Sequence, residues 1–185
     1  MFTPMPRTVF GSIVGLFLIA SVAAAPRVQA ADKGADDKPI AAKDAVVKEY
    51  LAVQQLLAND KIEGVQTHLS KIQEAAKSVG AESQDANIKK QAAEIAKNAA
   101  NEPKDLKEAR KAFKPLSSAI IALVQSAPPS ADAAPALYQV NCPMLKADWL
   151  QTSKDITNPY MGQDMLTCGS VTKTITPPAA GDKKK

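Results

Sequence analysis

The feature that most constrains the fold is a series of four stretches in which apolar residues recur every three or four positions. This spacing places the apolar side chains along one side of a helix, so each stretch predicts an amphipathic α-helix. The clearest stripe consists of Ile62, Val65, Leu69, Ile72, Ala76 and Val79. Because no stretch is apolar all round, each helix must bury one face against the others.

The predicted helices span about residues 40–58, 61–79 and 84–100, and a fourth opens at 101–103. Asn59-Asp60 is expected to cap the second helix, Gly80 to follow its end, and Pro103 to lie in the first turn of the fourth. Pro115 is expected to kink the fourth helix near Lys111. Short connections between four such helices predict an all-α fold, an antiparallel four-helix bundle over residues 40–127.

The stretch after the bundle differs from it in composition and in periodicity. Residues 128–136 are rich in Ser, Ala and Pro and predict a linker. Residues 137–172 lose the helical periodicity and predict an irregular segment packed on the bundle, and residues 173–185 predict a disordered basic tail. Abundant alanine and an aromatic content of 4% favour closely packed helices over a large sheet core. We therefore expect the bundle to stay folded without the segment that follows it.

The first thirty residues read as an export signal rather than as part of the fold. Arg7 precedes an uncharged apolar run from Val9 to Ala25, and Val28-Gln29-Ala30 offers small residues at the positions that a signal peptidase reads. Cleavage after Ala30 would leave an exported chain that opens with a flexible lead over residues 31–39. The alternative is an uncleaved membrane anchor. No second apolar run of spanning length follows, so no membrane span is expected in the mature chain.

Charge argues against nucleic-acid binding. The net charge is +4, and removal of Arg7 and Arg27 with the signal lowers it to +2. Lysines and acidic residues interleave along the helices, whereas nucleic-acid-binding domains usually gather basic residues on one face. We expect the lysines to form a solvated surface.

Candidate chemistry lies in the segment of residues 137–172. Four soft sulfur donors occur there in two pairs, Cys142 with Met144 and Met165 with Cys168, and Met161 is a fifth. Thiolate and thioether ligands favour copper(I) over hard cations. Residues two apart share one side of an extended strand, and residues three apart share one face of a helix. The two pairs could therefore close around one ion.

The same cysteines allow simpler interpretations. In an exported chain, Cys142 and Cys168 could form a structural disulfide that closes a loop of about 27 residues and stabilises the fold by roughly 3–4 kcal/mol. A redox-active dithiol is less favoured, because such pairs usually stand as Cys-x-x-Cys. With His68 as the single histidine, which suits a polar edge position, no catalytic set can be assembled, and we do not expect an enzyme.

The residues of this segment also resemble a known family. The pattern Cys142-Pro-Met, Trp149-Leu-Gln, Asn158-Pro-Tyr-x-Gly and Met165-x-x-Cys168-Gly is similar to that of a family of uncharacterised periplasmic domains. Such domains occur alone after signal peptides or fused to the adaptor (membrane-fusion) subunits of heavy-metal efflux systems. A weaker similarity in the helical part extends the resemblance to roughly residues 43–172.

The resemblance implies an association with copper or silver handling in the periplasm. It makes Cys142, Met144, Met165 and Cys168 the candidate ligands and a heavy-metal efflux or other envelope protein the candidate partner. Together with the sulfur pairs, it predicts an exported module that binds copper(I) or silver(I). The alternative is a non-catalytic envelope interaction module in which Cys142 and Cys168 form a structural disulfide.

Overall fold

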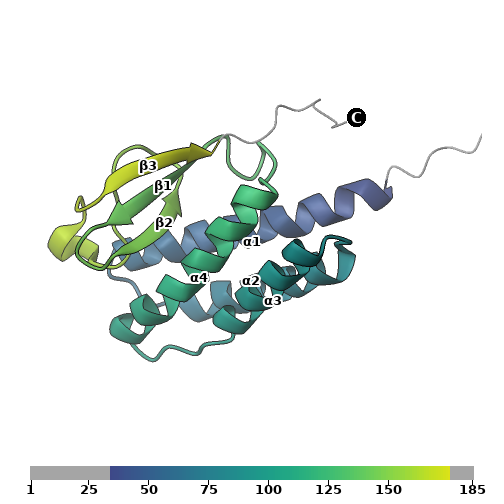
Figure 1. Ribbon diagram of the computed structural model, residues 1–185. Helices are drawn as coiled ribbons and strands as arrows, with labels where there is room; N and C mark the ends of the chain where they lie inside the picture. The colour runs from purple at the N-terminus through teal and green to yellow at the C-terminus, as the bar shows by residue number, and fades with distance from the viewer. Residues whose placement is uncertain (1–33, 176–185) are drawn as a thin grey trace, which may run out of the picture. The chain divides into compact units, whose positions relative to one another are not determined.

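The computed structural model describes residues 34–175 (Figure 1). Its elements are α1 (Gly34–Ala58), α2 (Val65–Glu82), α3 (Ala86–Ala99), α4 (Leu106–Ser126), β1 (Leu137–Cys142), β2 (Ala147–Gln151), the 3-10 helix η1 (Gly162–Met165) and β3 (Ser170–Ile175). The predicted signal peptide, the start of the predicted lead and the last ten residues of the predicted tail lie outside the described residues.

The four predicted helices are present, and consecutive helices pack against each other. The buried side of α2 is the predicted stripe, with Leu69, Ile72 and Val79 almost inaccessible to solvent. Two helices begin at aspartate caps, because Asp85 accepts hydrogen bonds from the first turn of α3 and Asp105 from that of α4.

Several helix ends differ from the prediction. The chain enters α2 through Gly64, whose φ of 88° is in the left-handed region, so Asn59-Asp60 does not cap this helix. Gly80 lies inside α2, where a Cβ would stand 3.5 Å from the Cβ of Ala92, and the helix continues to Glu82. Pro103 precedes α4 instead of lying in its first turn.

The predicted all-α fold is wrong, because the C-terminal part forms a three-stranded antiparallel sheet in the order β2-β1-β3. Strand β1 pairs on one side with β2, Val140 opposite Trp149, and on the other with β3, Asn141 opposite Ser170. A bulge between Gln139 and Val140 shifts the β1–β3 register. The segment is therefore not irregular, and β3 extends to Ile175, into the stretch predicted as tail.

The helices and the sheet share one hydrophobic core. Tyr50 of α1 stacks on Phe113 of α4 with ring centroids 5.0 Å apart, and Phe113 in turn contacts Tyr160, which lies edge-on to Trp149 of β2. All four side chains are at most 5% exposed. The core therefore does not stop at the end of α4, and we expect the helices to depend on the sheet.

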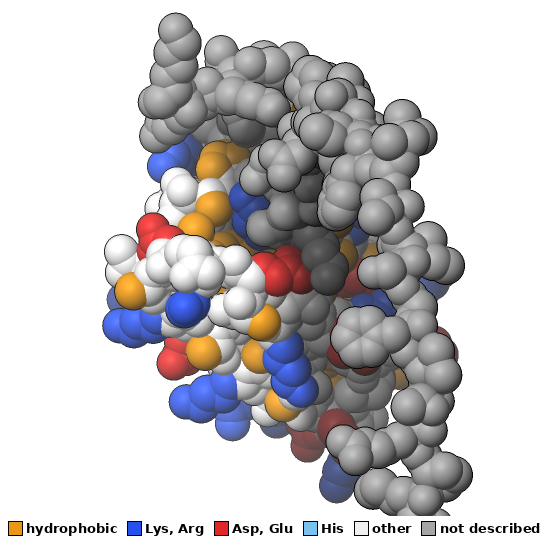
Figure 2. All heavy atoms as spheres, turned by 90° about the vertical axis from the view of Figure 1, so that its right-hand side faces the viewer, with side chains coloured by type: hydrophobic (Ala, Val, Ile, Leu, Met, Phe, Trp, Pro, Cys, Tyr) orange, Lys and Arg blue, Asp and Glu red, His pale blue; other side chains and the backbone are white. Residues whose placement is uncertain are grey.

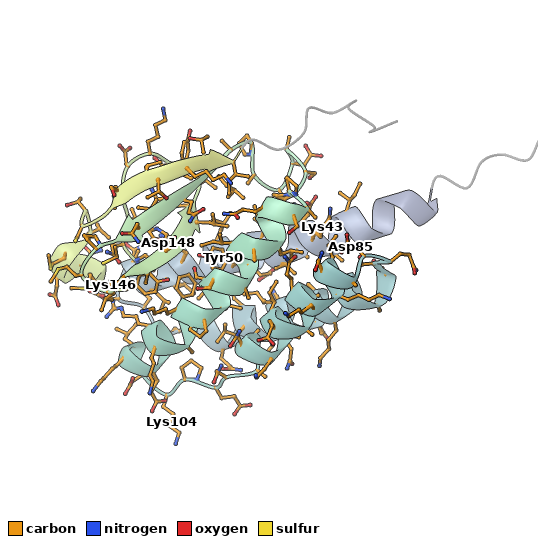
Figure 3. All side chains as sticks on the ribbon, viewed as in Figure 1. Lys43, Tyr50, Asp85, Lys104, Lys146 and Asp148 are labelled. Carbon is orange, nitrogen blue, oxygen red and sulfur yellow. The ribbon has the colours of Figure 1, made fainter. Side chains whose placement is uncertain are left out.

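A buried hydroxyl joins the same elements. The Tyr50 hydroxyl hydrogen-bonds the hydroxyl of Ser117 on α4 and accepts a hydrogen bond of 3.0 Å from the backbone N–H of Leu150 on β2. Figure 3 shows Tyr50 between α1 and the sheet. Burial raises the pKa of Tyr50 well above its usual range, so the hydroxyl stays neutral and available to both partners.

The described surface carries mixed charge. On the face drawn in Figure 2, lysine and arginine side chains are interspersed with acidic, polar and apolar ones. Among residues 34–175, no helix combines the length and the apolar character that crossing a membrane requires.

Deletion of residues 128–185 should unfold much of the helical part. The deletion would expose Tyr50 and Phe113 and remove the backbone partner of the Tyr50 hydroxyl, and a buried aromatic side chain alone contributes about 3–5 kcal/mol. Far-UV circular dichroism of the truncated chain should show a clear loss of helix, whereas a chain that lacks only residues 176–185 should match the full chain. Full helicity in the chain that lacks residues 128–185 would show that the four helices fold without the sheet.

Candidate functional site

The candidate site lies at one end of the sheet. Cys142 is the last residue of β1, and a four-residue turn, Pro143 to Lys146, leads from it into β2. Because Asn141 pairs with Ser170, the start of β3 lies beside this turn, and with it the stretch from η1 to Cys168. Figure 3 shows Lys146 of the turn at the same end of the sheet as η1. The register thus brings both predicted sulfur pairs to one end.

The two cysteines lie side by side there. Cys168 stands two residues before Ser170, the β3 partner of Asn141, and Cys142 follows Asn141 at the end of β1; both cysteines are free. Partial burial raises the pKa of Cys168, and the neighbouring Cys142 raises it further. Cys168 is therefore protonated at neutral pH unless a cation or a reaction partner displaces its proton.

The four candidate ligands differ in exposure. Cys142 is fully buried and Cys168 is half-buried, whereas Met144 is 60% exposed and Met165 is 39% exposed. Met161 is half-buried against the core and is thus accounted for by packing. The structure brings the two cysteines side by side and leaves both predicted thioether ligands on the surface of the same end of the sheet.

The local geometry of the two pairs departs from the prediction in one case. Met144 lies in the turn beyond β1 and does not share a side of the strand with Cys142. This turn is tied to α4 by a hydrogen bond of 2.9 Å from the ammonium of Lys114 to the carbonyl of Leu145. In the other pair, the N–H of Cys168 donates to the carbonyl of Met165, so these residues are one turn apart, as the spacing indicated.

Asn158 fixes the backbone around Cys168. Its side-chain amide donates to the carbonyl of Cys168 at 2.6 Å, and its side-chain oxygen accepts from the N–H groups of Tyr160 and Met161. Its own N–H donates to the carbonyl of Leu166 at 2.7 Å. Asn158 is fully buried, so each of these bonds is shielded from water. The asparagine thereby joins the two ends of the loop over residues 158–168.

A second set of contacts attaches this loop to the helices. Arg110 of α4 donates to the carbonyl of Pro159 at 3.0 Å, to the carbonyl of Leu57 and to the carboxylate of Asp60. The Asp60 carboxylate also accepts from the N–H of Gln163. The hydrogen bond from Arg110, followed by that from Gln163, lowers the pKa of Asp60. Arg110 and Asp60 therefore hold the loop against the ends of two helices.

Two glycines permit close approaches in this region. Gly162 has a φ of 60°, and a Cβ there would overlap the side chains of Asp60 and Arg110. Gly169 has a φ of 153°, and a Cβ there would lie 2.8 Å from the Trp149 ring and 3.1 Å from the carbonyl of Asn141. Gly169 thus lets the chain pass close enough to β1 for the two cysteines to lie side by side.

His68 takes no part in this site. It lies on α2, half-buried, with its Nδ1 atom 2.5 Å from Glu49 of α1, and Lys71 flanks the same carboxylate at 3.6 Å. Within residues 34–175 there is also no group of three or more histidine, cysteine, aspartate or glutamate side chains that could hold a metal ion. Any metal site at the end of the sheet would have to rely on the two thiols and on thioethers.

The sequence reasoning missed the residues that shape the site. In the sequence, Asn158 and Gly162 enter only as members of the Asn-Pro-Tyr-x-Gly pattern, and Asp60 is expected to cap a helix. Arg110 has no assigned role. The available signal was the pairing of an Asn-Pro-Tyr-x-Gly turn with a single arginine among the many lysines of the helices.

In the comparison with known proteins, the match that was found covers the helical part and the linker after it. Residues 46–132 match a family described as "Protein of unknown function (DUF3347)". The match runs from α1 to the linker and ends before β1, so the cysteines and methionines lie outside it. No curated protein and no solved structure matches the chain.

Replacement of Gly162 by alanine should destabilise the protein by at least about 2 kcal/mol, because a left-handed φ disfavours a side chain and the new methyl group displaces the Arg110–Asp60 pair. Urea denaturation measures this. Gly80→Ala is the matched control, since a helical position with ordinary contact distances should keep or gain up to about 1 kcal/mol. Equal behaviour of the two variants would contradict the tight loop contact.

Replacement of Asn158 by alanine should lower the free energy of unfolding by about 3 kcal/mol or more, because it leaves the Cys168 carbonyl and two backbone N–H groups without their hydrogen-bond partner. Asn158→Asp keeps the acceptor but loses the donor to Cys168, and it should cost less. The exposed Asn87, changed to alanine, should shift stability by at most about 0.5 kcal/mol. Thermal and urea unfolding would decide, and a tolerated Asn158→Ala would disprove the role of Asn158.

Proposed function

We propose that this chain is an exported, non-catalytic module that binds one copper(I) or silver(I) ion through Cys142 and Cys168. Met144 and Met165 supply thioether ligands from the surface. The observation that carries the proposal is the placement of the two cysteines side by side at the end of the sheet that also presents these two methionines.

The donor set fits a soft monovalent ion. Thiolates and thioethers prefer copper(I), and zinc in structural sites usually takes four ligands from cysteine, histidine and carboxylates. At this end of the sheet there are two thiols, and the described residues contain no group of three or more cysteine, histidine or carboxylate side chains that could hold a metal ion. A low-coordinate ion with sulfur ligands is therefore the better match to this end of the sheet.

The exposure of the methionines supports the same proposal. Large apolar side chains are usually buried unless they have another role, and single exposed ones carry little meaning. Here Met144 and Met165 are both exposed, and each stands within three residues of one of the two neighbouring cysteines. A role in ligation explains why these two methionines are exposed beside the thiols.

The export signal and the resemblance to periplasmic domains of heavy-metal efflux systems motivate the setting of the proposal. We propose a periplasmic location and a role in heavy-metal handling beside an efflux or other envelope protein. The match to the family of unknown function covers the helices and names no location, ion or partner.

A second candidate follows from the same placement. Two neighbouring thiols in an oxidising compartment can form a disulfide, and full burial of Cys142 suits a structural bridge. In that case the chain is an interaction module whose Cys142–Cys168 bridge fixes the loop over residues 158–168. Thiol counting on protein taken from the cell envelope separates the two candidates.

Titration of the reduced protein against a copper(I) chelator should reveal one tightly bound ion with sulfur scatterers in X-ray absorption. Cys142→Ser or Cys168→Ser should weaken binding at least about tenfold, or ~1.4 kcal/mol, because a hard hydroxyl replaces a soft thiolate. Met144→Leu and Met165→Leu should weaken it less. Met161→Leu is the matched control, since this methionine packs against the core, and it should bind as the wild type does.

Binding should also weaken as the pH falls. The ion must displace the thiol protons, and the raised pKa of Cys168 means that its proton competes over a wider pH range than that of an ordinary thiol. A reduced wild-type protein that binds copper(I) no better than the double Cys→Ser variant would end the copper proposal.

A further inference from the structure

Cys142 and Cys168 lie side by side, because Asn141 pairs with Ser170 and Gly169 packs against the carbonyl of Asn141, but they differ in their access to solvent. Cys142 ends a strand in the middle of the sheet, opposite Ala147 of β2, and its side chain is fully buried. Cys168 lies in the turn before β3, at the edge of the sheet, and is only half-buried. A reagent in solution can therefore reach Cys168 in the folded protein, whereas Cys142 is covered.

We propose that Cys168 is the thiol that exchanges with disulfides from solution and that Cys142 is the resolving thiol. The sheet end then converts between a dithiol and an intramolecular disulfide in a fixed order. The co-reactant is a low-molecular-weight disulfide, for which oxidised glutathione is the probe. This proposal does not depend on metal binding.

The exchange balances in two steps. In the first step, the Cys168 thiolate attacks one sulfur of the external disulfide, the external S–S bond breaks, one glutathione thiolate leaves, and a mixed disulfide remains on Cys168. In the second step, the Cys142 thiolate attacks the Cys168 sulfur and releases the second glutathione. The protein loses two electrons to the external disulfide, and the two thiol protons pass to the solvent and to the glutathione thiolates.

The fold keeps the resolving thiol in place for the second step. Asn158 holds the carbonyl of Cys168, and the backbone at Gly169 lies against the Trp149 ring and the carbonyl of Asn141. The loop is therefore already held with Cys168 beside Cys142. Resolution within one folded molecule is fast compared with attack by a second glutathione, so the mixed disulfide should not accumulate in the wild type.

The single-cysteine variants separate the two roles. Reduced, metal-free protein is incubated with oxidised glutathione in the presence of a chelator, quenched with acid, and analysed by intact-mass spectrometry. The wild type should lose two hydrogens and carry no adduct. Cys142→Ser should accumulate one glutathione on Cys168, and Cys168→Ser should gain glutathione on Cys142 at least about ten times more slowly, since Cys142 must wait for local opening.

A denatured control establishes that the fold sets the order. In denaturant both single variants should react at similar rates, because neither thiol is then covered. Circular dichroism of the two variants checks that each is folded before the native experiment. Equal native rates in two folded variants, or a wild type that accumulates the mixed disulfide, would overturn the proposal. A protein that fails to bind copper(I) leaves the proposal intact, because no metal enters this experiment.

Discussion

The hydroxyl group of Tyr50 lies where three parts of the molecule meet. It belongs to α1, bonds a hydroxyl on α4 and accepts the backbone N–H of Leu150 on β2, and its ring stacks on Phe113. Tyr50 is fully buried, so its hydroxyl would lose these hydrogen bonds at a cost if the elements moved apart. The position of the sheet relative to α1 and α4, and with it the position of both cysteines, depends on this buried group.

The helices were predictable because their apolar residues follow the helical repeat over many turns, as in α2. The ends of the helices were less predictable. A left-handed Gly64 opens α2, and Asp60 turns away from the helix to reach an arginine 50 residues further along the chain. Such ends are decided by tertiary contacts, which local sequence patterns do not contain.

The sheet was missed for a different reason. Strands of five or six residues offer few repeats, and β2 buries Trp149, Leu150 and Gln151 in succession, which hides the alternation of a half-buried strand. In β3 every residue before Ile175 is exposed. The sulfur residues of the site were identifiable by type and by spacing, but their meeting depends on the β1–β3 register, and this register includes a bulge that no local pattern announces.

The loop that carries Cys168 is held largely by hydrogen bonds to its backbone. Gln54 and Arg110 donate to the carbonyls of Thr157 and Pro159, Asp60 accepts from the N–H of Gln163, and Asn158 bonds three further backbone groups. Every residue type offers a backbone carbonyl, and every type except proline also offers a backbone N–H. Most side chains of the loop are therefore free to vary among related chains, whereas the few polar side chains that bind its backbone are not. A search for relatives that is guided by Gln54, Asp60, Arg110 and Asn158 would therefore not depend on the variable side chains of the loop.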